Sequence, residues 1–416
     1  MKVLVVGGGG REHTLVWKLL QSPKVSKIYC APGNGGTAKI AENLDLSDGD
    51  ISGLLKFAME TKIDLTVVGP EVPLVNGIVD QFEAKGLRVF GPNARAAILE
   101  GSKVFTKELL SKYNIPTAGY HRFTSADQAL KFLRSQKTYP LVIKADGLAA
   151  GKGVLIALSE TDARQGIGQI MEDKIFGSAG DEIIIEDFME GPELSMLCFV
   201  DSNSVVPMVS AKDYKRIGDG DTGLNTGGMG AISPNPLYDN ALETYCLNNI
   251  IQPTLDGMRT ENRPFKGILY CGIMITHDGP KVLEYNVRFG DPETQVILPR
   301  LKSDLFDIFN AIIDDRLDEI DISWDDHACA TVVLASAGYP ESYQKGYSIS
   351  GLESIRTSTV FHAGTKINSN ETVTNGGRVL AVTSTADSLE RALSQSYKNI
   401  ESIQFEGKTF RKDIGS

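Results

Sequence analysis

The first quarter of the chain alternates short apolar runs with segments of helical periodicity. Apolar runs predict strands at residues 2–6, 27–31, 64–68 and 87–90, and periodic segments predict helices at 11–20 and 73–85. Short strands separated by helices indicate βαβ units and a parallel sheet. Each strand ends in Gly, Pro or Asn residues, at the edge where open α/β sheets bind ligands. We therefore expect residues 1–101 to form an α/β domain that binds a small molecule.

The middle of the chain has a different pattern. It predicts helices at 101–113, 125–135, 159–171 and 304–313, and strands at 140–144, 154–158, 182–185 and 193–200. Residues 267–275 and 281–289 form a hairpin pattern around His277-Asp278-Gly279-Pro280. Residues 213–235 are polar and glycine-rich with almost no periodicity, and a structureless stretch of that length is typically functional or disordered.

The pattern restarts near residue 326. Strands are predicted at 328–335, 360–363 and 378–383, followed by a helix at 388–400. We therefore expect a central unit over residues 102–325 and a third domain of mixed α+β structure over residues 326–416.

Composition narrows the class of protein. The net charge of −11 over 416 residues argues against a long basic face for nucleic acid, and no apolar run approaches the roughly 20 residues of a membrane span. The start, Met-Lys-Val-Leu-Val-Val-Gly, indicates a buried strand and not a signal peptide. The five cysteines include no C-x-x-C pair, which is typical of buried thiols in a reducing cytosol. We expect a cytoplasmic monomer or weak homodimer, with no nucleic-acid partner and no membrane.

The first glycine cluster, Gly7-Gly8-Gly9-Gly10-Arg11-Glu12-His13, follows a predicted strand and opens a predicted helix. Backbone N–H groups and the helix dipole bind phosphate in this setting, and Arg11 suits a phosphate monoester. The cluster fails as a dinucleotide fingerprint, because Glu12 stands where G-x-G-x-x-G requires its third glycine. A nicotinamide oxidoreductase stays an alternative, as does a tight turn without a ligand.

The second glycine cluster runs from Lys144 to Gly153. A Walker A loop would need Gly at position 146 and Ser or Thr at 153, where the chain has Asp146 and Gly153, and it would need a helix next, where a strand is predicted. The cluster therefore indicates a hairpin flap whose amides and lysine close over ATP phosphates, with Lys144 placed for an inner phosphate. The other interpretation is a plain surface hairpin.

The strand pattern at 281–290 carries the clearest chemical signal. Alternation places Val282, Glu284, Asn286 and Arg288 on one face and apolar residues on the other. A carboxylate beside an amide oxygen suits Mg²⁺, with ATP phosphates completing the coordination, and Arg288 would lie beside the transferred phosphoryl group. An exposed amphipathic strand is the alternative.

The apolar strand Ile183-Ile184-Ile185 ends in Glu186-Asp187-Phe188-Met189, and Glu193 opens the next strand. This pattern suits an adenine hinge, in which backbone groups pair with the base and a carboxylate takes the ribose hydroxyls. The five histidines show no metal or triad spacing, and no G-x-S-x-G occurs, so nucleophilic catalysis by the protein is not indicated.

With these residues identified, the chain resembles the glycinamide ribonucleotide synthetases, a family of ATP-grasp ligases. Eight motifs carry the resemblance from end to end in the family's order: residues 9–13, 68–71, 100–103, 144–153, 225–231, 288–296, 374–380 and 411–415. The resemblance implies a Rossmann-like N-terminal domain, a central ATP-grasp unit with a flap subdomain at about 120–190, and a C-terminal domain.

The resemblance also implies roles for individual residues. ATP would be bound by Lys103, Lys144, the flap residues Gly147, Gly151, Lys152 and Gly153, the hinge Glu186, Asp187, Phe188 and Met189, and the ribose contact Glu193. Glu284 and Asn286 would hold Mg²⁺ or Mn²⁺, and Arg288 and Asp291 would flank the reacting groups. Glycine and 5-phosphoribosylamine would be bound by Gly9, Gly10, Arg11, Glu12 and His13 together with Asp213, Lys215, Thr226, Gly227 and Gly228.

The implied reaction is the ATP-dependent ligation of glycine to 5-phosphoribosylamine through glycyl phosphate, a step of purine biosynthesis. The chain departs from the wider ATP-grasp pattern on the strand 269–274, which lacks the additional metal-binding Glu of many members, so the number of metals stays open. Two alternatives are another ATP-grasp ligase or carboxylase of purine metabolism and a non-catalytic nucleotide sensor.

Overall fold

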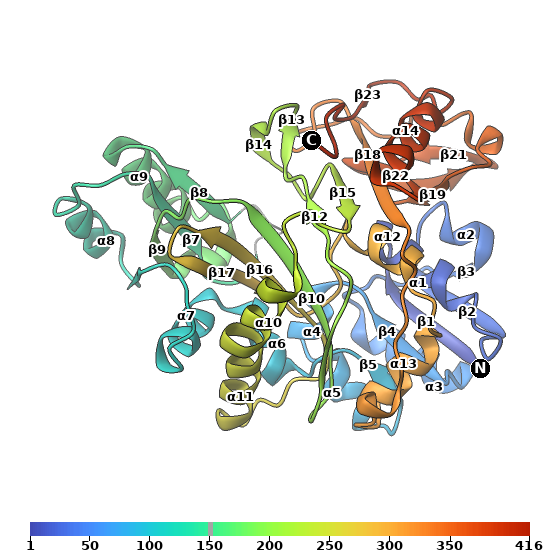
Figure 1. Cartoon of the computed structure of the whole chain (residues 1–416), viewed down its shortest axis with the longest axis horizontal. Helices are drawn as coiled ribbons and strands as arrows, with labels where there is room; N and C mark the ends of the chain where they lie inside the picture. The colour runs from blue at the N-terminus through green and yellow to red at the C-terminus, as the bar shows by residue number, and fades with distance from the viewer. Residues whose placement is uncertain (149–152) are drawn as a thin grey trace.

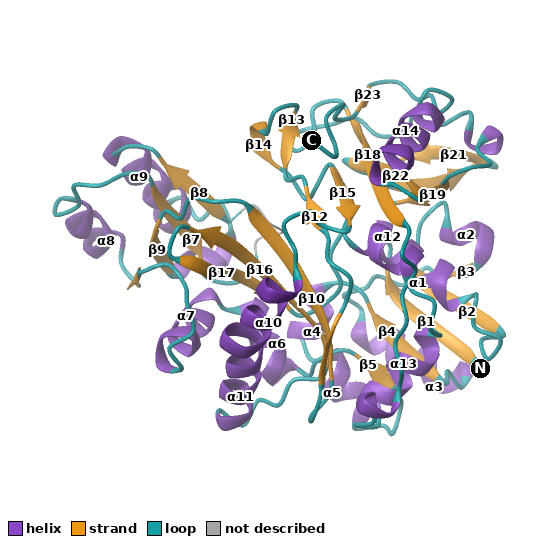
Figure 2. Cartoon of the chain, in the orientation of Figure 1, coloured by secondary structure: helices purple, strands orange, loops and turns teal. Residues whose placement is uncertain are grey.

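The computed structural model describes residues 1–148 and 153–416. Its main sheets have five, four, four and six strands, with helices packed on their outer faces (Figure 2). The central four-stranded sheet lies between a projecting four-stranded unit on one side and the two terminal regions on the other (Figure 1). The expected α/β architecture is confirmed.

The N-terminal sheet is parallel and has the order β3-β2-β1-β4-β5. Its elements are β1 (Lys2–Gly7), α1 (Gly10–Leu19), β2 (Lys27–Pro32), α2 (Thr37–Ile40), β3 (Glu42–Asn43), α3 (Ile51–Thr61), β4 (Leu65–Val68), α4 (Glu71–Val75), α5 (Ile78–Glu83), β5 (Val89–Phe90) and α6 (Ala94–Gly101). The single helix predicted at 73–85 is divided at Gly77, whose φ of +80° interrupts the helix. The strand order reverses between β1 and β4, where such sheets form their ligand crevice.

The projecting unit is an antiparallel sheet with the order β6-β9-β7-β8. Its elements are β6 (Tyr120–Phe123), α8 (Ala126–Leu133), β7 (Leu141–Ala145), β8 (Val154–Ala157), α9 (Glu160–Ile167) and β9 (Ile183–Asp187). It has an apolar core of its own, which includes Leu133, Ile143 and Ile185. This unit is therefore a compact body with a core distinct from that of the central sheet.

The central sheet is antiparallel with the order β11-β10-β16-β17. The elements are α7 (Lys103–Lys112), β10 (Glu193–Val200), β11 (Val205–Pro207), α10 (Asn240–Cys246), α11 (Gln252–Thr260), β16 (Gly267–Thr276) and β17 (Gly279–Asn286). One continuous apolar core joins this sheet to the N-terminal sheet, with Leu4 and Val68 on one side and Leu194 and Cys271 on the other. The shared core makes the two parts one platform.

The prediction of a structureless stretch at 213–235 is wrong, because short strands cross it. They are β12 (Lys212–Asp213), β13 (Arg216–Gly218), β14 (Thr222–Asn225) and β15 (Gly230–Ser233). β12 and β15 extend the C-terminal sheet, whose other strands are β18 (Ala328–Ser336), β19 (Thr359–His362), β22 (Arg378–Ala386) and β23 (Lys408–Thr409). Helix α14 (Leu389–Ile400) packs on this sheet, and α12 (Thr294–Ile297), α13 (Leu305–Ile313) and the hairpin of β20 (Thr365–Asn368) and β21 (Glu371–Thr374) complete the chain.

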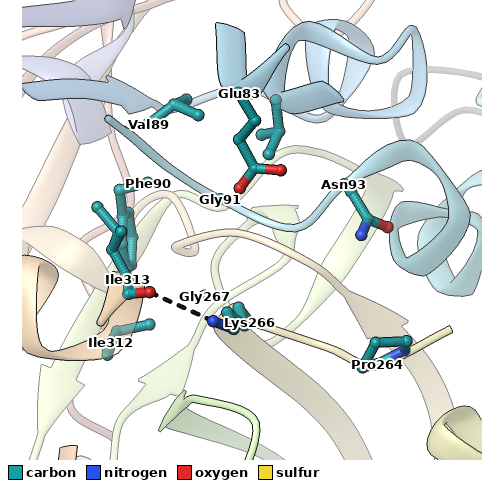
Figure 3. Close-up of a pocket in the computed structure, with 11 residues that line it drawn as sticks. Glu83, Val89, Phe90, Gly91, Asn93, Pro264, Lys266, Gly267, Ile312 and Ile313 are labelled. Carbon is teal, nitrogen blue, oxygen red and sulfur yellow. Dashed lines mark hydrogen bonds between the residues drawn. The ribbon is translucent and has the colours of Figure 1, made fainter. Parts of the chain in front are cut away.

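A small cavity of about 200 Å³ lies where α5 and β5 meet α13 and the segment 264–267 (Figure 3). Lys266 on its wall donates to the carbonyl of Ile313 and pairs with Asp315, while Glu83 faces it from α5. It shares no lining residue with the larger cavity described below. Within residues 1–148 and 153–416, no helix combines the length and the apolar character that crossing a membrane requires.

Candidate active site

A cavity of about 350 Å³ opens between the central sheet, the projecting unit and the carboxyl end of the N-terminal sheet. Its volume is typical of sites for small molecules. The structure brings together here Lys103, Lys144, Gly147, Gly153, Glu186, Asp187, Phe188, Met189, Glu193, Asp213, Lys215, Thr226, Gly227, Glu284, Asn286, Arg288 and Asp291. Segments up to about 200 residues apart in the sequence thus form one site. Gly151 and Lys152 of the predicted flap lie outside the described residues.

A buried ion triad stands on the nucleotide side of the cavity. Lys107 and Lys144 lie 3.2 and 2.9 Å from the two carboxylate oxygens of Glu186, and all three residues are less than a tenth exposed. Burial lowers the pKa of Lys107 to about 8, although Glu186 partly offsets that effect. The triad has a net charge of +1 when both lysines are protonated, and Lys103 lies one helical turn from Lys107 on α7. Carboxylates line other parts of the described cavity, so the positive charge that suits phosphate groups is concentrated on this side.

Lys107 was not predicted from the sequence, although a signal for it existed. It follows Lys103 by four residues on α7, and residues so spaced lie on one helix face. Lys103 donates to the carbonyl of Gly147, so it ties this helix to the start of the predicted flap. Glu186 was expected in the adenine hinge, but its carboxylate pairs with the two buried lysines. The next residue, Asp187, is exposed.

Glu284 and Asn286 both line the cavity from β17, as predicted, but the alternation of this strand is not regular. A β-bulge displaces the register between Val282 and Glu284, where Gly272 faces Glu284 and Ile273 faces Val282. As a result Val282 packs in the apolar core and Leu283 lines the cavity. The prediction that Val282 and Glu284 share one face is wrong. Alternation along the sequence assumes a regular strand and does not reveal where a bulge interrupts it.

The environment of Glu284 fits a divalent cation. Burial alone would raise its pKa, but Lys215, Lys144 and Lys103 outweigh burial and lower the pKa, so the carboxylate stays ionised. The amide oxygen of Asn286 lies on the same wall and accepts a hydrogen bond of 3.1 Å from Arg288. The described residues contain no group of three or more His, Cys, Asp or Glu side chains arranged for a metal. A cation held here would thus use Glu284, Asn286 and ligands from the bound nucleotide.

Arg288 is held by two carboxylates from other parts of the chain. Its guanidinium lies 3.3 Å from Glu71 and 3.0 Å from Glu100, and it also donates to the carbonyl of Phe289. Burial raises the pKa of Glu100, whereas for Glu71 the charges of Arg288 and Arg11 outweigh burial and lower the pKa. Three anchored contacts fix the position of the Arg288 fork on the cavity wall, as a stabiliser of developing negative charge requires.

Asp291 stands where the three sheet regions meet. Its carboxylate accepts from the backbone N–H of Arg11 at 3.1 Å and from Gln295 at 2.8 Å, and it lies 3.3 Å from the guanidinium of Arg378. Burial would raise its pKa, but Arg378 and Arg11 outweigh that effect and lower the pKa. Asp291 is therefore an ionised anchor between the first glycine cluster and the C-terminal sheet.

Asp213 and Glu293 place two further carboxylates at the wall. Burial, reinforced by the charge of Glu293, raises the pKa of Asp213 well above its ordinary value. Glu293 accepts hydrogen bonds from Tyr270 at 2.6 Å and Ser195 at 3.2 Å, so it is held in place. Lys215, which lines the cavity like Asp213, pairs with Glu193, the predicted ribose contact.

The first glycine cluster does not line the cavity. The Glu12 carboxylate folds back onto the backbone N–H of Gly9 at 2.6 Å, and it fills the space that side chains at Gly7 and Gly69 would need. The crevice between β1 and β4 is thus occupied by the protein itself, which disfavours a dinucleotide there. The amides of Gly9 and Arg11 both bond carboxylates, and Gly10 packs against Gln295.

His13 links the N-terminal sheet to the C-terminal one. Its Nδ1 accepts from the backbone N–H of His362 at 2.7 Å, and burial lowers its pKa to about 4. Asn34 strengthens the same junction, since its side-chain amide donates to the carbonyls of Gly8 and His362. In this structure His13 is therefore a neutral link between domains and does not face the cavity.

Comparison with known proteins agrees with this geometry. The family model of the phosphoribosylglycinamide synthetase N domain matches residues 1–100, that of its ATP-grasp (A) domain matches residues 101–294, and that of its C domain matches residues 329–416. A phosphoribosylamine–glycine ligase of Halalkalibacterium halodurans is 51% identical over 417 aligned residues, which cover 100% of this chain and 97% of the relative.

Solved structures give the same result. The crystal structure of a phosphoribosylamine–glycine ligase from Thermotoga maritima is 32% identical, with a TM-score of 0.82 and coverage of 99% of this chain and 100% of that one. The biotin carboxylase domain of a 2-oxoglutarate carboxylase from Hydrogenobacter thermophilus is 14% identical with a TM-score of 0.75, covering 98% of this chain and 91% of that one, which shows a common fold alone. From these matches and the site, the chain belongs to the phosphoribosylglycinamide synthetase family of ATP-grasp proteins.

Proposed function

We propose that the chain catalyses the ATP-dependent ligation of glycine to 5-phosphoribosylamine, forming glycinamide ribonucleotide, ADP and phosphate. The observation that carries the proposal is the match of all three family domains, in order, together with a cavity whose walls combine five cations with an ionised Glu284. The relatives bear the name of this activity over essentially the full chain length.

The chemistry would proceed in two displacements. A carboxylate oxygen of glycine attacks the γ-phosphorus of ATP, the bond to the β–γ bridging oxygen breaks, and ADP leaves. The amine nitrogen of phosphoribosylamine then attacks the acyl carbon and loses a proton, while the bond to the phosphate oxygen breaks. No protein nucleophile is needed, in keeping with a site of lysines, an arginine and carboxylates.

The side chains of the chain would divide this work by position. Lys103, Lys144 and Lys107 would neutralise the phosphates of the nucleotide, and the hinge at Phe188 and Met189 would hold the base. Arg288 would stabilise the charge that develops on the transferred phosphoryl group. Closure of the projecting unit over the cavity would exclude water from the acyl phosphate.

A divalent cation, Mg²⁺ or Mn²⁺, would be held by Glu284 and Asn286. When bound, it supplies charge neutralisation at the β- and γ-phosphates. The residue opposite Glu284 on the neighbouring strand β16 is Gly272, which has no side chain and so offers no acidic ligand. We therefore propose that Glu284 and Asn286 are the protein ligands of the cation.

We also propose the division of the chain at 1–101, 102–325 and 326–416, with the projecting unit as the flap subdomain. Strands β12 and β15 come from the central segment but belong to the C-terminal sheet, so this sheet contains strands from both sides of the proposed boundary at residue 326. A cytoplasmic location is supported by the five cysteines, all of which are buried and unpaired.

Substrate-dependent release of ADP tests the function. The proposal predicts ADP formation that requires both glycine and phosphoribosylamine, and one product molecule for each ADP. ADP formation with a different acid and amine but none with this pair would contradict the substrate assignment. Stabilisation by NADH but not by nucleotide and divalent metal, measured as a thermal shift, would contradict the ligase assignment altogether.

A further inference from the structure

Residues 326–416 supply no lining residue to the described part of the cavity, yet two of their side chains hydrogen-bond to the cavity wall. The wall segment Thr226–Gly228 joins β14 to β15 and lies beside Asp291. The hydroxyl of Tyr339 accepts from the backbone N–H of Gly227 at 2.9 Å. The guanidinium of Arg378 donates to the carbonyl of the same residue, so both backbone polar groups of Gly227 are held.

Arg378 also fixes Asp291. The same Nη1 donates to the Asp291 carbonyl at 2.7 Å and lies 3.3 Å from its carboxylate. The guanidinium is largely buried, with its side chain 21% exposed. It thus joins two wall residues, Gly227 and Asp291, that are 64 positions apart in the sequence, and no hydrophobic contact could set their separation as sharply.

Two glycines precede Arg378 and allow it and Tyr339 to approach the wall segment closely. Arg378 follows Gly376 and Gly377 at the start of β22. A side chain at Gly377 would lie 2.2 Å from the ring of Tyr339, and one at Gly376 would lie 2.8 Å from Gly364. The two glycines therefore let Tyr339 and Arg378 approach the wall together.

Steric contacts and hydrogen bonds restrict the backbone conformation of the wall segment. Gly228 has a φ of +112°, and a side chain there would lie 2.3 Å from Pro292 and 2.6 Å from Asp213. The hydroxyl of Thr226 bonds the carbonyl of Lys215 and accepts from the N–H of Gly228. These contacts hold the backbone of the segment, and Thr226 and Gly227 line the cavity.

We propose that Arg378 and Tyr339 are positioning residues, which hold the Thr226–Gly228 wall and Asp291 in the geometry that receives the amine substrate. This inference rests on the proposed function. On one side, Asp291 contacts Arg11 and Arg378. Lys144 and Glu186 are on β7 and β9 of the projecting unit, which lies apart from β15 (Figure 1). Loss of the contacts made by Arg378 and Tyr339 should therefore affect the amine substrate and leave ATP binding unchanged.

Steady-state kinetics of Arg378→Gln, Arg378→Ala and Tyr339→Phe in the full chain test the inference. We expect Arg378→Gln to raise the KM for phosphoribosylamine about 10- to 100-fold, because misplacement of a substrate-positioning wall by about 1 Å has effects of that size. Tyr339→Phe removes one hydrogen bond and should raise it about two- to tenfold. The KM for ATP should change less than about twofold in each variant. Guanidinium ion at tens of millimolar should partly restore the Arg378→Ala variant.

Arg411→Gln is the matched control. Arg411 is another buried arginine of the C-terminal region, and it pairs with Asp413 and Asp221, not with the cavity wall. Its replacement should lower stability while the ratio of the two KM values stays that of the wild type. A soluble Tyr339→Phe with wild-type kinetics, or equal shifts of both KM values in the Arg378 variants, would overturn the inference. A wild type inactive with glycine and phosphoribosylamine would overturn the proposed function and this inference with it.

Discussion

The replacement Gly228→Ala gives a quantitative test of the wall geometry. Gly228 has a φ of +112°, and a Cβ atom there would lie 2.3 Å from Cδ of Pro292 and 2.6 Å from a carboxylate oxygen of Asp213. Neither neighbour can withdraw easily, because the proline ring is part of the backbone after Asp291, and Asp213 is paired with Ala231 of β15. The alanine can be accommodated only by moving the wall.

Two effects set the free-energy cost of placing an alanine at position 228 while the wall keeps its native conformation. An L side chain in this backbone region costs about 1–2 kcal/mol, and overpacking against buried neighbours costs about 1–3 kcal/mol more. The sum of about 2–5 kcal/mol lowers the population of the native wall, and about 1.4 kcal/mol corresponds to a factor of ten. We therefore expect kcat/KM for phosphoribosylamine to fall at least about 30-fold.

Gly220→Ala is the control for this experiment. Gly220 lies in the turn between β13 and β14 with a φ of +67°, and a side chain there would meet nothing within 4 Å. It carries the backbone strain of about 1 kcal/mol without the clash. ADP release measured against phosphoribosylamine should show near wild-type kinetics for this variant. Equal losses in the two variants, or an equal rise in the KM for ATP in Gly228→Ala, would refute the reasoning.

Three further predictions concern charge. Glu284→Gln should lower kcat at least about 100-fold and weaken the dependence of turnover on divalent metal; a kcat within about threefold of wild type would contradict its role. Glu186→Gln leaves two buried lysines facing each other and should lower the free energy of unfolding in urea by about 3–5 kcal/mol, whereas Glu160→Gln in an exposed pair should cost less than about 1 kcal/mol. The pKa of His13 is lowered from 6.5 to about 4, so unfolding takes up a proton between these pH values, and stability is lost as pH falls through that window. The difference is about 3 kcal/mol, and unfolding measured from pH 7 to 4 should show a flatter decline for His13→Asn.

Strong local patterns predicted much of the fold. The strand predicted at 193–200 is β10, and the predicted hairpin is β16 and β17, because alternating or continuous apolar runs reflect burial directly. The strands within 213–235 were missed because they are two to four residues long, and one of them, β15, pairs with β18, about 100 residues away. Contacts of that kind leave no periodic signal in the sequence.

The site was predictable where chemistry and position coincide on one element. Glu284, Asn286 and Arg288 line the cavity together because they follow one another on β17 and its extension. The contacts that fix them come from elsewhere: Glu71 and Glu100 hold Arg288, and Arg378 holds Asp291. The sequence gives no distance between such segments, so the roles of the anchoring residues emerge only from the fold.

The most direct test of the central claim follows a labelled oxygen. If the carboxylate of glycine attacks ATP and the amine then expels phosphate, glycine labelled with ¹⁸O in its carboxylate must transfer one labelled oxygen to phosphate for each ADP formed. Mass spectrometry of the phosphate measures this transfer. The account predicts one labelled oxygen in each phosphate molecule, present only when phosphoribosylamine and ATP are both supplied. Phosphate without label, formed together with the ligated product, would contradict the account.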